Sequence, residues 1–377
     1  MTDNYYHALV IDKKCEFPYL IPLFSEEELK QYSLKIKQDK EAGKDLSNEN
    51  NIIWTPILER YDEIENIYFS PDDIFNFLNI EMLFVDSDIN IYRLSSTKEI
   101  VKKHSKPKYK NAVLYGGLEY NNIDTDIIAG TDKKPNILYR ELNERGGFDP
   151  LYNTFDEVNY VSAILKERGL STTTYTAGDG TEESFKNLEG KQVNLLHMAT
   201  HGVYLRPQEI QSKKQLNNWN FLELSNTDNP VMEDISLSHS FLVMSGGNLL
   251  SRRDSIAIGK DDGILTAYEV SRLDLRNLDL VVLSACQSAL GDNEREGLYG
   301  LQRGFKKAGA DTIVMSLRNV DDEATKILMM AFYRNLMIGK SKQQSFKDAQ
   351  KHLRHVENGK YDKPEYWASF IMLDGLN

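Results

Sequence analysis

The sequence predicts an α/β fold in which a mostly parallel central sheet is flanked by helices, and three observations support this. Short unbroken apolar runs of strand length recur, as at Leu280–Leu283, and such runs are typical of strands buried on both faces of a parallel sheet. Amphipathic helical stretches, as at 155–168, alternate with these runs, which predicts right-handed strand–helix–strand units. Hydrophobic residues make up 41% of the 377 residues, which is enough for a full core.

The individual elements follow from apolar periodicity and from turn residues. Strands are expected at 5–12, 67–69, 91–94, 112–117, 171–175, 193–199, 241–244, 279–285, 312–317 and 367–373. The strand at 241–244 is expected to continue the central sheet. Helices are expected at 26–40, 55–64, 155–168, 182–188, within 262–275, and at 298–308, 322–336 and 344–355. Gly169 and Gly309 follow helices at positions that favour glycine. Asp179 and Glu182 have the spacing of a capping box, and Asp322 is expected to cap the helix that follows it.

Domain organisation is predicted from a basic, proline-containing stretch at 102–110, which is typical of a solvated linker. We therefore expect a smaller α/β region at 1–105 and a larger α/β domain at 106–377. Two polar stretches, at 121–150 and 203–239, interrupt the larger domain as long loops. A loop as long as the second one is more typical of a functional segment than of an idle connection.

The composition limits the functional classes. The formal net charge of −12 argues against nonspecific binding to nucleic acid or to anionic membranes, because both need a basic surface. No apolar run approaches the roughly 20 residues that span a bilayer, and the first residues lack the pattern of a secretory signal. The two cysteines, Cys15 and Cys286, form no disulfide framework and fit a reducing compartment. We expect a cytoplasmic protein without nucleic-acid or membrane partners.

Two of the expected strands are followed by residues that can carry out acyl transfer. The strand at 193–199 leads to His201 and Gly202, and the strand at 279–285 leads to Cys286. If these strands are parallel neighbours, the imidazole and the thiol emerge at the carboxyl edge of the sheet, where ligands bind in open α/β folds. The thiolate can attack a carbonyl group while the imidazole handles protons. The N–H groups of Gly202 and Cys286 are candidates to stabilise the resulting oxyanion.

Each of these features has a simpler structural explanation when taken alone. A cysteine after a buried strand is often a small core residue, and His-Gly after a strand is often only a turn. His197 and His201 are four residues apart, but a strand lacks the helical geometry and the glutamate of a zinc protease, so no metal site is predicted. His197 is instead expected to pack in or beneath the sheet. No phosphate-binding loop or dinucleotide fingerprint is present, so no cofactor is expected.

Several independent motifs occur in order in the second part of the chain. They are HMATHG (197–202), DGILTAYEV (262–270), LDLVVLSACQSALG (278–291), EGLYGLQRGFKKAGADTIVMSL (296–317), VDDEAT (320–325) and YWASF (366–370). Together they resemble the CHAT domain, the caspase-like peptidase domain that often follows tetratricopeptide repeats in bacteria. The resemblance covers roughly residues 110–377.

The resemblance implies a caspase-like three-layer sandwich and a cysteine endopeptidase with a His–Cys dyad. His201 matches the histidine of the family, and Cys286 matches its cysteine. It further implies specific protein substrates and a role in bacterial defence or programmed cell death. On activation, the loop at 203–239 or the loop at 287–296 is expected to be cleaved or reordered. Residues 1–105 would form a degenerate caspase-like half. Because the usual repeats are missing from this sequence, a separate regulatory protein is the expected partner besides the protein substrate.

Candidate substrate-binding residues also come from the resemblance. In caspase-like folds, the loop after the strand at 312–317 helps to form the pocket for the substrate residue before the cleaved bond. This loop contains Arg318, Asp321 and Asp322, and Arg318 stands where the family often has tryptophan. Ser284 stands where metacaspases carry an aspartate in this pocket, so their preference for basic residues is not carried over. Asp321 and Asp322 have a second explanation, which is capping of the following helix.

A non-catalytic function is the alternative. In that case the chain keeps the caspase-like fold as a scaffold or interaction module and performs no chemistry. The intact dyad argues against this alternative. The reactivity of the thiol at Cys286 discriminates between the two functions, because a catalytic thiol must react and a structural one is inert.

Overall fold

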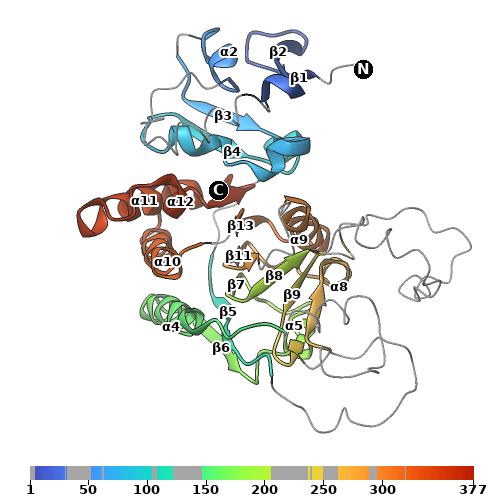
Figure 1. The fold of residues 1–377 in the computed structure, drawn as a ribbon, viewed down its shortest axis with the longest axis vertical. Helices are drawn as coiled ribbons and strands as arrows, with labels where there is room; N and C mark the ends of the chain where they lie inside the picture. Colours follow the sequence, from blue (N-terminus) through green and yellow to red (C-terminus); the bar gives the residue numbers. More distant parts are fainter. Residues whose placement is uncertain are drawn as a thin grey trace, which may run out of the picture. The chain divides into compact units, whose positions relative to one another are not determined.

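The computed structural model describes residues 5–29, 31, 52–61, 63–103, 108–121, 147–204, 237, 240–248, 262–287, 295–318 and 320–377. For some of these, Cys286 and Gln287 among them, only the backbone is described. The chain divides into two compact units, Met1–Ile67 and Tyr68–Asn377 (Figure 1).

The first unit contains a two-stranded antiparallel sheet and a short helix. Strand β1 (Tyr5–Val10) pairs with β2 (Tyr19–Ser25), and α2 spans Thr55–Leu58. Exposed and partly buried residues alternate along β1, as expected for a strand with one covered face. The buried apolar side chains of this unit include Ile21, Phe24, Leu29 and Trp54. The helix expected at 26–40 lies mostly outside the described residues, and α2 is shorter than the helix expected at 55–64.

The second unit is built on an eight-stranded sheet with the order β3-β4-β14-β13-β11-β7-β5-β6. The strands are β3 (Asn66–Phe69), β4 (Asn90–Arg93), β5 (Asn111–Leu118), β6 (Ser171–Ala177), β7 (Leu195–Met198), β11 (Leu280–Leu283), β13 (Thr312–Ser316) and β14 (Phe370–Leu373). Every pairing from β13 through β11, β7 and β5 to β6 is parallel. Strand β14 runs antiparallel to β13 and parallel to β4. The predicted α/β fold with a mostly parallel sheet is therefore confirmed.

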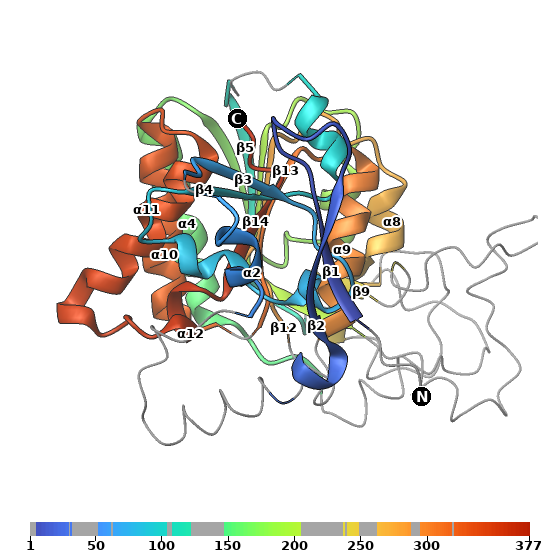
Figure 2. The same cartoon turned by 90° about the horizontal axis from the view of Figure 1, so that it is seen from above.

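Helices cover both faces of this sheet and give three layers (Figure 2). On one side lie α4 (Tyr152–Glu167), α10 (Asp322–Met337) and α11 (Lys342–His355), and on the other side lie α8 (Ala267–Ser271) and α9 (Arg295–Ala308). Two apolar clusters fill the spaces between the layers, and each contains fully buried aromatic side chains. Burial of each such side chain contributes roughly 1.5–3 kcal/mol, so the two clusters hold the sheet rigid.

Shorter helical segments complete the unit. They are α5 (Glu182–Lys186), α12 (Pro364–Trp367) and the 3-10 helices η1 (Asp73–Phe77), η2 (Ile80–Phe84), η3 (Thr97–Val101) and η7 (Val356–Gly359). Within the part of the chain that the structure describes, no helix is both long and apolar enough to cross a membrane.

A second, four-stranded sheet has the order β10-β9-β8-β12. Its strands are β8 (His201–Tyr204), β9 (Ser240–Val243), β10 (Ile264–Thr266) and β12 (Cys286–Gln287). Strand β9 is antiparallel to β8 and β10, whereas β12 is parallel to β8. The sequence predicts that residues 241–244 continue the large sheet, but they belong to this small sheet.

Two helix caps differ from the predicted ones. The hydroxyl of Thr181, not the side chain of Asp179, accepts the capping hydrogen bond of α5, from the N–H of Ser184 at 3.1 Å. The cap of α10 is Asp321, not Asp322, because Asp321 Oδ1 accepts from the N–H of Ala324 at 2.9 Å. In both cases several polar residues precede the helix, and the backbone path selects the one that reaches the third N–H group.

The predicted domain boundary after residue 105 remains a prediction. Strand β4 comes from the first 105 residues, yet it pairs with β14 through Arg93 and Leu373. The expectation that residues 1–105 form a degenerate caspase-like half likewise remains a prediction.

Candidate functional site

The backbone brings His201 and Cys286 together. Strands β7 and β11 are parallel neighbours in the large sheet, and the chain continues from each of them into the small sheet. The continuations, β8 and β12, also pair in parallel, with His201 opposite Cys286 and Gly202 opposite Gln287. Because paired strands lie about 4.8 Å apart, the backbones of the two proposed dyad residues are adjacent.

The imidazole of His201 is enclosed by aromatic side chains. It is 7% exposed, and its ring centroid lies 5.0 Å from that of Tyr120 and 5.3 Å from that of Phe148. Its Nε2 atom lies 2.7 Å from the carbonyl oxygen of Asp149. Burial lowers the pKa of His201 below its ordinary value of 6.5, and the Asp149 carbonyl opposes only part of that shift. The ring is therefore mainly neutral at pH 7.

The contact with Asp149 determines which ring nitrogen of His201 carries the proton. A carbonyl oxygen can only accept a hydrogen bond, so Nε2 must donate and must be protonated. A neutral imidazole has one N–H group, which leaves the lone pair on Nδ1. The neutral ring therefore presents Nδ1 as its proton-accepting atom.

The residues before Cys286 are fixed by the neighbouring strands. Ser284 is 4% exposed, and the hydroxyl of Ser316 at the end of β13 donates to the carbonyl of Ala285 at 2.8 Å. Gly202 packs on the same residue, since a Cβ atom at Gly202 would lie 3.3 Å from the Cβ of Ala285. The chain immediately before Cys286 is thus held by side chain and backbone contacts from two strands.

The three candidate residues after β13 lie in different surroundings. Arg318 is exposed as a whole residue, but burial of its guanidinium lowers its pKa, and its Nε donates to the hydroxyl of Ser369 at 3.1 Å. Asp321 caps α10, as described above. Asp322 Oδ2 accepts from the side-chain amide of Asn153 at 2.9 Å. Capping of the helix, the structural explanation for Asp321, is therefore observed. A role in substrate binding remains a prediction for Ser284, Arg318, Asp321 and Asp322.

His197 is a buried structural residue. It is fully buried, with Nδ1 at 3.0 Å from the hydroxyl of Tyr333 and Nε2 at 3.0 Å from Oε1 of Glu157. Both ring nitrogens are therefore engaged within the core. Among the described residues, no group of three or more His, Cys, Asp and Glu side chains is arranged to hold a metal ion.

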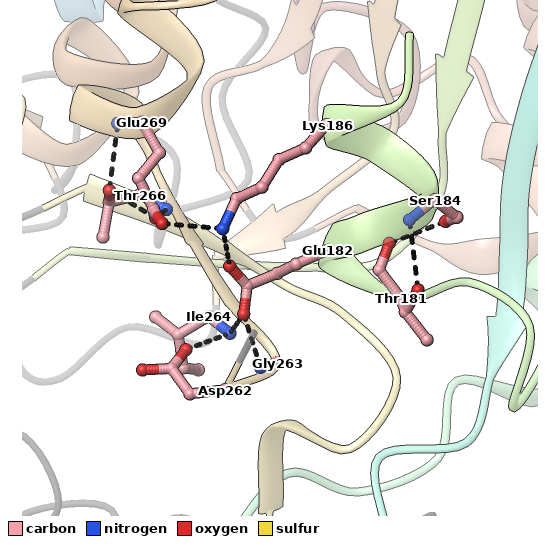
Figure 3. Close-up of polar contacts among 9 residues, drawn as sticks. All are labelled: Thr181, Glu182, Ser184, Lys186, Asp262, Gly263, Ile264, Thr266 and Glu269. Atoms are coloured by element: carbon pink, nitrogen blue, oxygen red, sulfur yellow. Dashed lines mark hydrogen bonds and ion pairs between the residues drawn. The ribbon is translucent and has the colours of Figure 1, made fainter. Parts of the chain in front are cut away.

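A buried charge cluster ties α5 to the start of β10 (Figure 3). Glu182 is 1% exposed, and its Oε1 accepts from the N–H groups of Gly263 at 2.6 Å and Ile264 at 3.2 Å. Its Oε2 forms an ion pair with Lys186 at 2.9 Å. The capping box that the sequence predicts for Glu182 is wrong, because this carboxylate bonds to a segment about eighty residues away instead of to its own helix.

Two further carboxylates complete this cluster. Lys186 also contacts Oε1 of Glu269 at 3.0 Å, and Asp262 hydrogen-bonds both Glu182 and the N–H of Ile264. Burial and the Glu182 carboxylate raise the pKa of Asp262 well above its ordinary value, and burial also raises the pKa of Glu182. Glu182 has the N–H donors and the lysine, so Asp262 is the group that retains a proton.

We expect Asp262→Asn to stabilise the protein at neutral and alkaline pH. The folded-state pKa of Asp262 exceeds its unfolded value, so the free energy of unfolding falls as pH rises from about 4 through the folded-state pKa. Asparagine keeps the shape without the ionisation, so the gain should be present at pH 8 and near zero at pH 4. Urea unfolding at both pH values measures it. The exposed Asp179→Asn is the control, and an equal pH dependence in all three proteins would contradict the assignment.

Two residues of the site are missed by reasoning from the sequence, and the role of a third residue, Glu182, which lies outside the site, is predicted wrongly. The two missed residues are Asp149, which acts through its carbonyl group, and Asn248, which bonds the segment next to Asp149. A contact made by a backbone carbonyl group cannot be predicted from residue type, because every residue has this group. Asn248 and Glu182 make contacts across 100 and 81 residues, respectively, and no spacing motif encodes such contacts.

Residues 44–375 match the family model of the CHAT domain, which is most of the chain. The chain belongs to the CHAT domain family. The resemblance noted from the motifs at His201 and Cys286 is thus confirmed at the level of the family. The comparison covers the whole region in which the two sheets and their flanking helices lie.

Among curated proteins, tetratricopeptide repeat protein 28 of Mus musculus is 36% identical over 112 residues, and its Homo sapiens counterpart is 32% identical over 111 residues. Each match covers 29% of this CHAT chain and 4% of the relative. The chain therefore spans only a small part of the length of these relatives.

Two solved structures of gingipain are similar to this CHAT chain. The crystal structure of the Arg-specific cysteine proteinase gingipain R aligns with a TM-score of 0.49 and 10% identity, over 87% of this chain and 68% of that one. The complex of the pro- and mature domains of RgpB from Porphyromonas gingivalis aligns with a TM-score of 0.46 and 11% identity, over 86% and 68%.

Proposed function

We propose that this chain is a cysteine endopeptidase in which Cys286 is the nucleophile and His201 the proton carrier. The observation that carries the proposal is the pairing of β8 with β12, which sets His201 opposite Cys286. Membership of the CHAT family supports the same chemistry. The low pKa that burial gives His201 supports a neutral imidazole that is ready to accept a proton at pH 7.

The proposed reaction has two halves. Nδ1 of His201 accepts the thiol proton of Cys286, and the sulfur attacks the carbonyl carbon of the scissile peptide bond. The N–H groups of Gly202 and Cys286 are the proposed donors to the oxyanion. The imidazolium then gives its proton to the departing amine as the C–N bond breaks, which leaves a thioester. Water attacks the thioester with His201 as base, and the thiol and a carboxylic acid are released.

Substrates, partners and location are further parts of the proposal. We propose specific protein substrates, with Arg318 as a substrate-contacting residue. Ser284, Asp321 and Asp322 are proposed as further contacts. A role in bacterial defence or programmed cell death, proteolytic activation, a separate regulatory protein and a cytoplasmic location are proposed on the family resemblance alone.

Thiol labelling tests this function without knowledge of the substrate. An iodoacetamide probe followed by peptide mapping is expected to label Cys286 at least about tenfold faster than Cys15. Partial burial and the nearby Asp12 carboxylate raise the pKa of the Cys15 thiol, which lowers its thiolate fraction. A Cys286 that reacts no faster than Cys15, with or without cleavage within 203–239 or 287–296, would support the scaffold alternative.

A further inference from the structure

The carbonyl group that holds His201 belongs to a short irregular segment, residues 147–150, which is neither helix nor strand. Irregular backbone is not held by a ladder of hydrogen bonds, so its position depends on individual contacts. The ring of Phe148 packs against His201, and the next residue, Asp149, supplies the carbonyl oxygen. Any group that holds Phe148 in place therefore also holds the Asp149 carbonyl, which is the hydrogen-bond partner of His201 Nε2.

Asn248 fixes Phe148 by two hydrogen bonds at once. Its Oδ1 accepts from the N–H of Phe148 at 2.6 Å, and its Nδ2 donates to the carbonyl of Phe148 at 2.9 Å. The side-chain amide thus bonds to both polar groups of one residue, as a neighbouring β-strand does. Asn248 is 5% exposed, so these bonds form away from solvent, where loss of a partner is costly.

Asn248 is itself anchored to two residues that follow β5, Tyr120 and Asn121. Its backbone N–H donates to the carbonyl of Tyr120 at 2.8 Å, and its Nδ2 also donates to Oδ1 of Asn121 at 3.2 Å. Tyr120 is the second aromatic neighbour of the His201 ring. We call the side chain of Asn248, with its two hydrogen bonds to Phe148, the clamp. The clamp therefore ties the Phe148 segment to Tyr120, whose ring packs on His201.

Gly147 shows how closely the segment approaches the clamp. It has φ of +92°, and a Cβ atom there would lie 2.6 Å from Oδ1 of Asn248. Both the backbone conformation and this distance exclude a side chain unless the segment moves. The segment and Asn248 fit only in the observed arrangement.

We propose that Asn248 is a positioning residue that holds the Asp149 carbonyl on Nε2 of His201 and thereby fixes the Nε2–H tautomer of the imidazole. The neutral ring then keeps its lone pair on Nδ1, the atom that accepts the thiol proton in the proposed function. The effect on catalysis rests on that proposed function. The tautomer of His201 does not rest on the proposed function, because it follows from the hydrogen bond between Nε2 and the Asp149 carbonyl alone.

Nitrogen-15 NMR of this 377-residue chain, labelled at its histidines, tests the proposal without a substrate. His201 is assigned by its loss in His201→Ala. In the wild type above its pKa, we expect Nε2 to be protonated and Nδ1 unprotonated. Asn248→Asp keeps the acceptor for Phe148 but loses the donor, and Asn248→Ala loses both. In each variant we expect a mixture of tautomers and a rise of the His201 pKa toward its ordinary value, because the ring becomes hydrated.

The matched control is Asn277→Asp, which alters an asparagine whose Nδ2 donates to the carbonyl of Lys191 far from the site. It should leave the tautomer unchanged. If the Asn248 variants do not fold, Gly147→Ala decides instead, because it displaces the segment and leaves the amide intact. Retention of the pure Nε2–H tautomer and of the wild-type His201 pKa in the folded variants would overturn the proposal.

Kinetics separate this proposal from the function on which it rests. With a cleavable peptide, the Asn248 variants should lose about 10- to 100-fold in kcat with little change in KM, as expected when a reacting group is misplaced by about 1 Å. If the wild type cleaves no peptide, the proposed function fails while the tautomer experiment still tests Asn248. If the tautomer changes and kcat does not, the clamp is structural and its proposed role in catalysis is wrong.

Discussion

Replacement of Cys286 by alanine is expected to abolish peptide hydrolysis. Without the sulfur no acyl-enzyme forms, and the loss in kcat should exceed about 1,000-fold. A peptide-library cleavage profile of the wild type identifies a substrate, and its turnover by the variant measures the effect. Strand β12 pairs with β8 through its backbone, so the smaller side chain should leave the fold intact.

Cys15→Ala is the matched control for this experiment. Cys15 lies in the first unit, next to the backbone N–H of Asp12, and has no part in the proposed chemistry. Its variant should retain wild-type turnover within about twofold. Cleavage of a peptide by Cys286→Ala at a rate close to that of the wild type would exclude Cys286 as the nucleophile.

Replacement of His201 by alanine is expected to lower kcat by about 100- to 10,000-fold, the range typical of general acid–base catalysis. Turnover by the wild type should fall as pH decreases through the pKa of His201, because the protonated ring cannot accept the thiol proton. Burial places that pKa below 6.5, so activity should persist into mildly acidic solution. The variant should lack this acidic limb.

His355→Ala is the control for His201, because this histidine is exposed at the end of α11 and its Nδ1 bonds the Lys351 carbonyl of its own helix. It should retain the rate and the pH profile of the wild type. An unchanged acidic limb in His201→Ala would show that another group titrates there. Measured stability of both variants accounts for the lost contacts of His201 with Tyr120 and Phe148.

Most strands and helices can be predicted from the sequence, because the burial of their side chains follows a local pattern of apolar residues. The run at Leu280–Leu283 is buried on both faces as β11, and the stripe from Val158 to Leu165 packs as α4. Helix caps are harder to predict from the sequence, since Thr181 and Asp321 have polar neighbours of equal capping ability. The choice among them depends on the backbone path into the helix, which sequence does not specify.

The existence of a separate small sheet, and which strands join it, cannot be predicted from the sequence. Residues 241–244 have the apolar character of any buried strand, and this character does not say which sheet a strand joins. Strand β9 pairs with β8 and β10, and the pairing of β8 with β12 in the same small sheet sets His201 opposite Cys286. Pairing is a contact between distant segments, so only the folded chain determines it.

The sequence by itself determined the α/β class, the family motifs and the two candidate residues, His201 and Cys286. These follow from periodicity and residue type, which are local properties of the chain. The tertiary structure alone decided that the Asp149 carbonyl holds the imidazole, that Asn248 holds Phe148 and that Glu182 binds the start of β10. Each is a hydrogen bond to the backbone across at least 52 residues, and a backbone group has the same chemistry in every residue type.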